Sequence, residues 1–406
     1  MKRSISVILL LAISTFVACA PVAETEQPEV GILAEEEAVM DYSRYNLDTY
    51  LKPFWHTREV YNETVLFVGE EDVAPLMYAP SEILSVRNYG LDIEYTEGID
   101  YTIVDGCIKR LSGSSIPFIE VDEYYRITPD RISIELINNL SGYEFAEKRF
   151  LMFGEGDTFT KNQIAVSYRH DKPWEGIKIQ GAADKFVNAL EKIKSGNGKI
   201  LFFGDSITAG SNASGTTQGG NISPYCDSWP VMVTEFIKQK YSVPLEYINT
   251  AIGGTNTQNG VNRFQEDVLA YAPDLLVIAY GMNDGNTQTI SYGFLIENMI
   301  TMYREAVPEG NVLLVSPMLP NVETDWCLNQ PNFEEVLADI AEKNDFCALA
   351  PITSMHKDIL KTGKRYRDGT GNNVNHPNDF MGRVYAQVVL KTILGDDYFV
   401  ETYTNE

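Results

Sequence analysis

The sequence is poor in side chains that bind metals. It has four histidines and five cysteines among 406 residues. No two cysteines form a CxxC pair, and the histidines lie far apart, at His56, His170, His356 and His376. Structural and catalytic zinc sites draw their ligands from histidines and cysteines at short, regular spacings. We therefore expect no metal site.

The sequence is also short of positive charge. Lysine and arginine together number 32 against 57 aspartates and glutamates, which gives a formal net charge of −25. This excess repels the phosphates of nucleic acids and the surfaces of anionic lipids. Nucleic acid is therefore not an expected partner, and solubility outside the cell is the ordinary role of such a charge.

Long apolar runs are absent beyond the N-terminus, so no later segment is expected to span a bilayer. At the N-terminus, Lys2 and Arg3 precede an apolar run at residues 5–18. The run is too short for an ordinary transmembrane helix and is typical of an export signal. We expect the protein to leave the cytoplasm.

The end of this run resembles a bacterial lipobox, with Phe16, Val17 and Ala18 before Cys19. This interpretation gives a signal peptide at residues 1–18 and a lipid on Cys19, which anchors an envelope lipoprotein to the membrane. Residues 19–44 are rich in Glu, Pro and Ala and are predicted to form a flexible acidic tether. Cleavage after Ala20 is the alternative, but Pro21 would then follow the scissile bond and hinder an ordinary signal peptidase.

Four further cysteines follow, and their spacing does not reveal whether they pair. They are Cys107, Cys226, Cys327 and Cys347. An exported protein meets oxidising conditions in which disulfides form, yet buried free thiols are equally common. Both alternatives stay open at this point.

The hydrophobic pattern divides the chain into two regions. With 44% apolar and 22% charged residues the chain has a globular composition, and 406 residues exceed the roughly 250–300 that one core usually serves. Short alternating or β-branched runs fill the first region, at residues 65–68, 83–87, 92–96, 131–136 and 163–168. Two more runs flank Asp105 and Gly106, a dipeptide that closes tight hairpins. These features predict a β-sandwich or jelly-roll domain at residues 45–178.

In the second region, apolar strands alternate with amphipathic helices. The strands are expected at residues 199–203, 245–249, 275–280, 312–316 and 346–350. Helical spacing appears in Val261, Phe264, Val268 and Leu269, and again in Phe380, Val384 and Val388. The alternation predicts a doubly wound α/β domain with a parallel sheet at residues 179–406.

Polar residues follow three of the predicted strands, at the edge where such sheets bind ligands. Asp205 and Ser206 follow the first strand, Gly254 the second and Asn283 the third. A serine needs a base to take its proton, and the oxyanion formed by its attack needs preorganised donors. Ser206 and Gly254 offer backbone N–H groups and Asn283 a side-chain amide, which together make a three-donor oxyanion hole.

The expected base is His376, which stands in a polar stretch just before the last amphipathic helix. The blocks around Ser206, Gly254, Asn283 and His376 occur in the order that resembles the SGNH or GDSL hydrolase family. The resemblance covers about residues 196–395 and implies catalytic roles for these four residues, with Asp205 as part of the motif. The α/β-hydrolase elbow GxSxG is excluded, because Thr208 occupies the place of its second glycine.

One departure from the family concerns the third member of the triad. The family usually has an aspartate three residues before the histidine, and this chain has Asn373. Asn373 is therefore an uncertain third member, because an amide orients the ring without adding charge. Three explanations remain open: a dyad in which His376 leans on a backbone carbonyl, a carboxylate from Asp368 or Asp379, or a degraded enzyme.

The resemblance implies a serine esterase that needs no cofactor. A β domain ahead of an SGNH domain on an exported chain is similar to two-domain carbohydrate esterases, which implies acetylated polysaccharide as substrate. Two alternatives stay open. One is a lipase or thioesterase acting on longer acyl chains, and the other is a non-catalytic surface lipoprotein that binds glycan.

Overall fold

The computed structural model of the protein describes residues 40–140 and 142–399. The expected signal peptide, Cys19 and most of the expected tether lie outside these residues. The chain from Asp41 onward forms one compact unit. Within the described residues, no helix combines the length and the apolar character needed to cross a bilayer.

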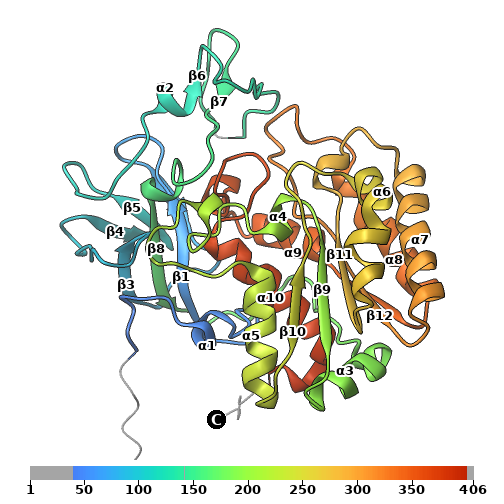
Figure 1. Ribbon diagram of the computed structural model, residues 1–406. Coiled ribbons are helices and arrows are strands. Elements are labelled where there is room, and N and C mark those ends of the chain that lie inside the picture. Colours follow the sequence, from blue (N-terminus) through green and yellow to red (C-terminus); the bar gives the residue numbers. More distant parts are fainter. Residues whose placement is uncertain (1–39, 141, 400–406) are drawn as a thin grey trace, which may run out of the picture. The chain divides into compact units, whose positions relative to one another are not determined.

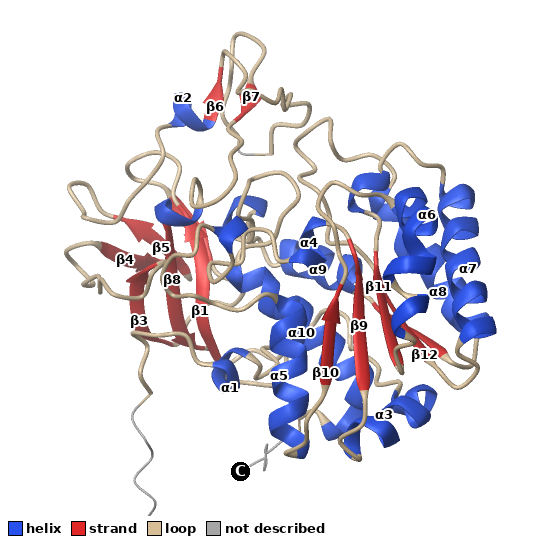
Figure 2. Cartoon of the chain, in the orientation of Figure 1, coloured by secondary structure: helices blue, strands red, loops and turns tan. Residues whose placement is uncertain are grey.

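A five-stranded parallel sheet lies at the centre of the C-terminal region (Figure 2). Its order is β10-β9-β11-β12-β13, and every neighbouring pair is parallel. The strands are β9 (Lys199–Gly204), β10 (Glu246–Asn249), β11 (Leu275–Ala279), β12 (Asn311–Val315) and β13 (Cys347–Ala350). All five expected strands are present within a few residues, and the predicted doubly wound α/β fold is confirmed.

Helices cover both faces of this sheet (Figure 1). Alternate residues of β9 point to opposite sides, because successive side chains of a strand alternate. Ile200 and Phe202 pack with α3 (Val187–Lys194), α5 (Trp229–Tyr241), α9 (Ile352–Lys361) and α10 (Asp379–Leu394). Leu201 and Phe203 pack with α6 (Thr257–Asp267), α7 (Thr289–Ala306) and α8 (Phe333–Lys343). Burial on both faces explains why these strands read as continuous apolar runs.

The N-terminal region consists of small antiparallel sheets, as its alternating pattern predicts. One sheet has the order β1-β8-β3, a second β2-β5-β4, and a third pairs β6 with β7. The strands are β1 (Glu59–Leu66), β2 (Val73–Pro75), β3 (Glu82–Asn88), β4 (Tyr101–Val104), β5 (Cys107–Arg110), β6 (Tyr125–Arg126), β7 (Phe150–Leu151) and β8 (Gln163–Arg169). The predicted hairpin joins β4 to β5, and Asp105 and Gly106 have φ angles of 51° and 79°.

Two runs that were expected to be strands are not strands. Residues 92–96 make one isolated bridge, Arg87 to Glu94, because the chain turns back on itself through Asn88. Residues 131–136 pair at single positions with two different segments, Phe150 and Thr324. An apolar alternation marks a half-buried segment, but it does not supply a continuous partner strand.

Short helical turns complete the fold. Three are α-helical: α1 (Leu47–Tyr50), α2 (Val121–Tyr124) and α4 (Ser206–Ala209). The others are 3₁₀ turns: η1 (Thr160–Asn162), η2 (Ala183–Phe186), η3 (Thr217–Gly219), η4 (Leu269–Tyr271), η5 (Met282–Asp284), η6 (Gln330–Asn332), η7 (Tyr366–Asp368) and η8 (Gly395–Asp397).

The β1-β8-β3 sheet and the α/β region share one hydrophobic core. Val65 of β1 and Val166 of β8 belong to the same buried cluster as Val384 of α10. A buried ion pair also joins the regions, with Lys364 Nζ 2.7 Å from Glu63 Oε1. The division into domains at residue 178 stays a prediction.

The four cysteines of the described region are free thiols. Cys226 and Cys347 are buried, and Cys107 and Cys327 are partly exposed. Of the two alternatives that the sequence left open, the structure has the unpaired one.

Candidate active site

The ends of β9, β10 and β11 meet at one edge of the sheet. β9 connects to β10 on one side of it and β11 connects to β12 on the other side, so the strand order switches direction between β9 and β11, where such sheets form a ligand-binding crevice. Gly204 ends β9 where a Cβ would stand 2.4 Å from the carbonyl oxygen of Ala279, so only glycine fits. The chain then turns sharply into α4, whose first residue is Ser206.

Ser206 and His376 are in direct contact. The Ser206 hydroxyl is 2.8 Å from His376 Nε2, although the two residues are 170 positions apart in the sequence. Ser206 is 6% exposed and His376 is 8% exposed. The pair is therefore largely shielded from bulk water but still reaches the surface of a pocket.

The other ring nitrogen of His376 faces two side-chain oxygens. Nδ1 lies 2.8 Å from Asn212 Oδ1 and 3.2 Å from Glu155 Oε2. Asn212 Nδ2 donates to the carbonyl oxygens of Gly156 and Gly371, which fixes the amide with its oxygen towards the ring. Since both groups facing Nδ1 are acceptors, we assign the proton to Nδ1. This leaves Nε2 as the acceptor for the Ser206 hydroxyl.

Asn373 does not contact the imidazole ring, contrary to the expectation for a third triad member. Its Oδ1 accepts a hydrogen bond from the Tyr124 hydroxyl, and its Nδ2 donates to the carbonyl oxygen of Met152. A φ angle of 70° turns the residue this way. The three-residue spacing to His376 therefore does not translate into contact here.

The other groups proposed for Nδ1 are also engaged elsewhere. Asp368 accepts from the Leu66 backbone and pairs with Arg365, and Asp379 accepts from the Ser214 backbone. Among the described residues no backbone carbonyl contacts this nitrogen, and both of its hydrogen-bond partners are side chains. Asn212 and Glu155 therefore occupy the position beside Nδ1 in place of Asp368, Asp379 or a backbone carbonyl.

The predicted oxyanion donors line the same pocket as the Ser206–His376 pair. The pocket has a volume of about 490 Å³, and Gly254 and Asn283 are in its wall. Gly254 has a φ angle of 76°, and the space where a side chain would project is open. Asn283 Nδ2 donates to the carbonyl oxygen of Thr255 at 3.0 Å, which anchors its amide beside the loop that carries Gly254.

The pocket is lined by both apolar and polar side chains. The apolar ones are Ile132, Ile134, Phe153, Trp326 and Val374. The polar ones include Glu155, Ser211, Gln218 and Asn375. Some residues of each kind come from residues 132–155, so the N-terminal region contributes directly to the site.

Buried carboxylates lie beneath the site. Burial raises the pKa of Asp205 to about 7, against the opposing hydrogen bond from the Ile207 backbone and the nearby His376. Burial also raises the pKa of Asp284, which accepts from the Thr257 backbone. Asp205 caps α4 through Ile207 N at 3.0 Å, so its side chain fixes the turn that presents Ser206.

Comparison with known proteins identifies the segment that carries this site. Residues 202–381 match the model of the GDSL-like lipase/acylhydrolase family. The predicted family resemblance is thereby confirmed, and its expected blocks lie inside the GDSL-like segment.

Two curated proteins are similar to parts of the chain. An uncharacterised lipoprotein of Bacillus subtilis is 29% identical over 129 residues, which cover 30% of this chain and 49% of that protein. An arylesterase of Vibrio mimicus is 31% identical over 87 residues, 21% of this chain and 38% of the relative. The chain thus spans about half, or less, of the length of these relatives.

Solved structures that are similar to parts of the chain have lower sequence identity. A two-domain esterase active on acetylated mannans has a TM-score of 0.43 and 24% identity, covering 56% of this chain and 56% of that one. An acetylxylan esterase from Geobacillus stearothermophilus has a TM-score of 0.40 and 22% identity, covering 48% of this chain and 94% of that one.

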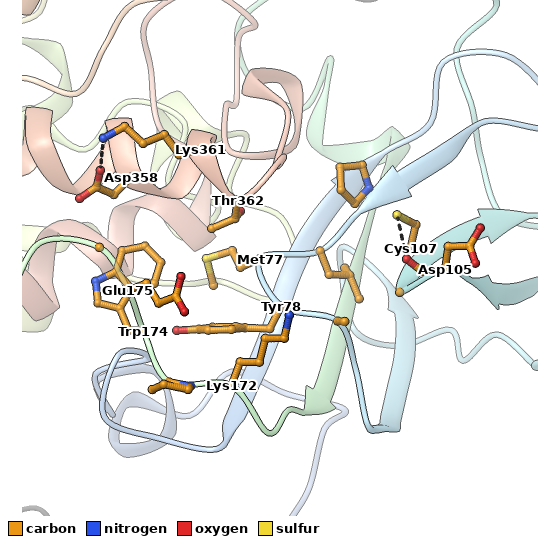
Figure 3. A pocket seen from close by; sticks show the side chains of 16 residues that line it. Met77, Tyr78, Asp105, Cys107, Lys172, Trp174, Glu175, Asp358, Lys361 and Thr362 are labelled. Carbon is orange, nitrogen blue, oxygen red and sulfur yellow. Dashed lines mark hydrogen bonds and ion pairs between the residues drawn. The ribbon is translucent and has the colours of Figure 1, made fainter.

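A second cavity of about 540 Å³ lies away from the pocket that contains Ser206 and His376. Figure 3 shows Tyr78 and Trp174 on one side of it and Lys361, ion-paired to Asp358, on another. Its lining comes from residues 75–79, the β4–β5 hairpin, residues 172–176 and α9. None of the expected site residues lines this cavity.

Sequence reasoning missed Asn212 and Glu155. Asn212 is 164 positions and Glu155 221 positions from His376, and neither stands in a recognisable block. Glu155 also precedes the GDSL-like segment. Only the fold brings the two residues to the ring, and no local pattern pointed to them.

Proposed function

We propose that the protein is a serine esterase in which Ser206 is the nucleophile and His376 the general base. The observation that carries the proposal is the 2.8 Å contact between Ser206 Oγ and His376 Nε2, in a pocket that also contains Gly254 and Asn283. A serine attacks an ester only when a base within hydrogen-bond distance removes its proton. The family match of the surrounding segment supports the same chemistry.

The reaction proceeds in two halves. Ser206 Oγ attacks the acyl carbonyl while His376 Nε2 takes the hydroxyl proton, and the Ser206 and Gly254 backbone N–H groups and the Asn283 amide receive the oxyanion. Collapse of this intermediate expels the alcohol, which takes the proton from His376, and leaves an acyl-enzyme. His376 then deprotonates a water that hydrolyses the acyl-enzyme and restores Ser206. No step requires a cofactor.

For the substrate, we propose an acylated carbohydrate, most simply an acetyl ester. The pocket of about 490 Å³ is far larger than an acetyl group and has hydroxyl and amide side chains at Ser211, Gln218 and Asn375. Phe153 and Trp326 add aromatic surface on which the apolar face of a sugar can stack. A pocket that combines polar and aromatic side chains suits a sugar better than a uniformly apolar chain.

One observation favours a second candidate, an ester with a longer acyl chain. Ile132, Ile134 and Val374 form an aliphatic surface in the same pocket. Burial of apolar area contributes roughly 25 cal/mol per Å², so an octanoyl chain would gain from this surface. The acyl preference decides between the candidates.

The experiment is a panel of esters with matched variants. Wild-type protein is incubated with p-nitrophenyl acetate, p-nitrophenyl octanoate and acetylated xylan, alongside Ser206→Ala and the exposed control Ser195→Ala. We expect activity on the acetyl substrates in wild type and Ser195→Ala, and none in Ser206→Ala. Activity confined to octanoate transfers the assignment to the second candidate. A protein inert on every ester contradicts the esterase proposal and favours a glycan-binding lipoprotein.

For location, we propose an envelope lipoprotein anchored through Cys19. The lipobox-like residues before Cys19 and the similarity to a Bacillus subtilis lipoprotein support this. Expression in a bacterium fed with radiolabelled palmitate tests it. We expect label in the wild-type protein and none in Cys19→Ser, and equal labelling of both would contradict the anchor.

A further inference from the structure

Glu155 is the one carboxylate that contacts His376 among the described residues. Its Oε2 lies 3.2 Å from Nδ1, on the side of the ring opposite Ser206. It comes from the loop between β7 and β8, before the GDSL-like segment begins at residue 202. A carboxylate at this nitrogen stands where a serine-hydrolase triad needs one.

We propose that Glu155, from the N-terminal region, is the charged positioning residue of the Ser206–His376 pair, and that it shares Nδ1 with the neutral Asn212. The inference rests on the proposed esterase function and adds a residue from outside the family segment to its machinery. Asn212 orients the ring, and Glu155 supplies the negative charge that an amide lacks.

The different roles of Asn212 and Glu155 follow from their distances to His376 Nδ1. Asn212 Oδ1 is closer to Nδ1, at 2.8 Å, and its amide is locked by two backbone carbonyls. A neutral acceptor fixes the tautomer but contributes little when the ring becomes positively charged. Glu155 at 3.2 Å is near enough to stabilise that charge through space.

Glu155 is tied to the turn that carries His376. Its Oε1 accepts a hydrogen bond from Asn372 Nδ2 at 3.1 Å. Asn372 Oδ1 in turn accepts from the backbone N–H groups of Val374, Asn375 and His376. The carboxylate and the ring are therefore held by the same side chain, so their separation is fixed by the fold rather than by chance contact.

The neighbouring residue reinforces this arrangement. The carbonyl oxygen of Gly156 accepts from Asn212 Nδ2, so residues 155 and 156 together hold both partners of Nδ1. A short N-terminal segment thus determines the orientation of a base that lies more than two hundred positions later. These two contacts from adjacent residues indicate that the N-terminal segment is a structural part of the site.

Glu155 carries its charge at neutral pH. Burial raises the pKa of its carboxyl, but the hydrogen bonds from His376 and Asn372 and the charge of His376 outweigh burial and hold the pKa below its usual range. Asp205 also interacts electrostatically with His376, and burial raises its pKa to about 7. With Asp205 partly protonated near neutrality, Glu155 is the principal negative charge at the ring.

The side chain of Glu155 is 50% exposed, so its effect is moderate. Loss of a buried triad aspartate costs about 10⁴ in turnover, and solvent screening weakens an exposed charge, so we expect about a tenfold loss here. The test variant is Glu155→Gln, which keeps the shape and removes the charge. Glu147→Gln, an exposed residue of the same region, is the matched control.

The decisive readout is the pH profile of kcat/KM on p-nitrophenyl acetate. Removing a negative charge disfavours the imidazolium, so the acidic limb of Glu155→Gln should move to lower pH while kcat falls about tenfold and KM changes little. A merely structural role would lower the amount of active protein without moving the limb. The limb of Glu147→Gln should coincide with that of wild type.

NMR of the His376 ring provides a readout that does not depend on turnover. The signal of the proton on Nδ1, which faces Glu155, should differ between Glu155→Gln and wild type and should be the same in Glu147→Gln and wild type. An unchanged signal and an unchanged pH profile, with an active wild type, would overturn the role of Glu155 and leave the esterase intact. A wild type inert on all esters would refute the esterase, while the Nδ1 signal would still decide whether Glu155 acts on the ring.

Discussion

Single residues around His376 divide into those that touch the ring and those that hold the turn beneath it. Asn212 touches Nδ1 at 2.8 Å. Asn373, three positions before the histidine, instead bonds to Tyr124 and Met152. We therefore expect a change at Asn212 to affect turnover and a change at Asn373 to affect stability.

Alanine variants of the two asparagines should separate these roles. Asn212→Ala frees Nδ1 from its closest partner, and we expect kcat to fall on the order of 10²-fold, within the range of general-base effects. Asn373→Ala leaves a buried hydroxyl and a carbonyl without partners and puts alanine at a φ of 70°. We expect it to lower the free energy of unfolding by about 3 kcal/mol with kcat within about threefold. Equal loss of kcat in both would contradict this division.

Asp205 makes stability depend on pH. Its folded pKa of about 7 exceeds the usual 3.8, so between these values the folded state holds a proton that the unfolded chain has released. This contribution is complete below the lower value and is lost as pH rises through 7. Asp205→Asn cannot titrate, so the stability of wild type relative to this variant should fall by about 3 kcal/mol from pH 5 to pH 8. Urea unfolding at both pH values measures it, and a constant difference would be inconsistent with a protonated Asp205.

Some residues of the site can be predicted from the sequence and others cannot. Ser206, Gly254, Asn283 and His376 follow strand ends or precede a helix, where local patterns point to them. Asn212 and Glu155 reach the ring only through long-range packing, and no pattern within either segment identifies them. Asn373 is the opposite case. Its spacing from His376 matches the family pattern, but a positive φ turns its side chain away from the ring.

At the scale of elements, the turn between η7 and α10 carries His376, the proposed base. The carbonyl oxygen of His376 accepts from Gly371 N at 3.0 Å and from Thr370 Oγ1 at 2.8 Å, which closes the turn. Gly371 also packs directly on Asn212, where a Cβ would stand 2.4 Å from that residue's Cβ. The turn and the loop after α4 therefore lie in contact at a position where only glycine fits.

Gly371→Ala should disturb the site through this contact. The added methyl group must displace Asn212 from Nδ1, and we expect a loss of about 1–3 kcal/mol in stability together with lower kcat. Gly382→Ala in α10 is the control, because its Cβ meets nothing within 4 Å. We expect that change to be neutral or to stabilise by up to about 1 kcal/mol through helix propensity. Thermal unfolding and kcat are measured for both, and an inactive Gly382→Ala would undermine the steric explanation.

Elements differ in how well the sequence predicts them. β9, β11 and β12 are buried on both faces and are continuous apolar runs, so their positions are predictable. The runs at 92–96 and 131–136 have the alternation of strands but lack partner strands, because the chain turns locally or meets two segments at single positions. Whether a segment pairs with a neighbouring strand depends on the whole fold and not on the apolar pattern of that segment alone.

At the scale of the molecule, the β1-β8-β3 sheet supports the turn that carries His376. Leu66 N of β1 donates to Asp368, and Gln163 of β8 donates to the carbonyl oxygens of Arg367 and Thr370. Lys364 donates to Glu63 in the buried ion pair. The antiparallel region is thus part of the framework of the site, which no motif in either region indicates.

Breaking the buried pair should therefore impair both stability and activity. Lys364→Met leaves the Glu63 carboxylate buried and unpaired, and we expect a loss of about 3–5 kcal/mol. The double variant Glu63→Gln/Lys364→Met removes the unpaired charge and should recover part of this loss. Urea unfolding of the single and double variants measures the coupling. A single variant as stable as wild type would show that the pair does not link the regions.

The central claim, that His376 activates Ser206 as a nucleophile, is tested most directly by a fluorophosphonate probe and mass spectrometry. We expect one label per chain, on the peptide containing Ser206, with much slower labelling in His376→Ala and none in Ser206→Ala. Labelling that persists in Ser206→Ala, or a wild-type protein that takes up no label, would contradict the claim.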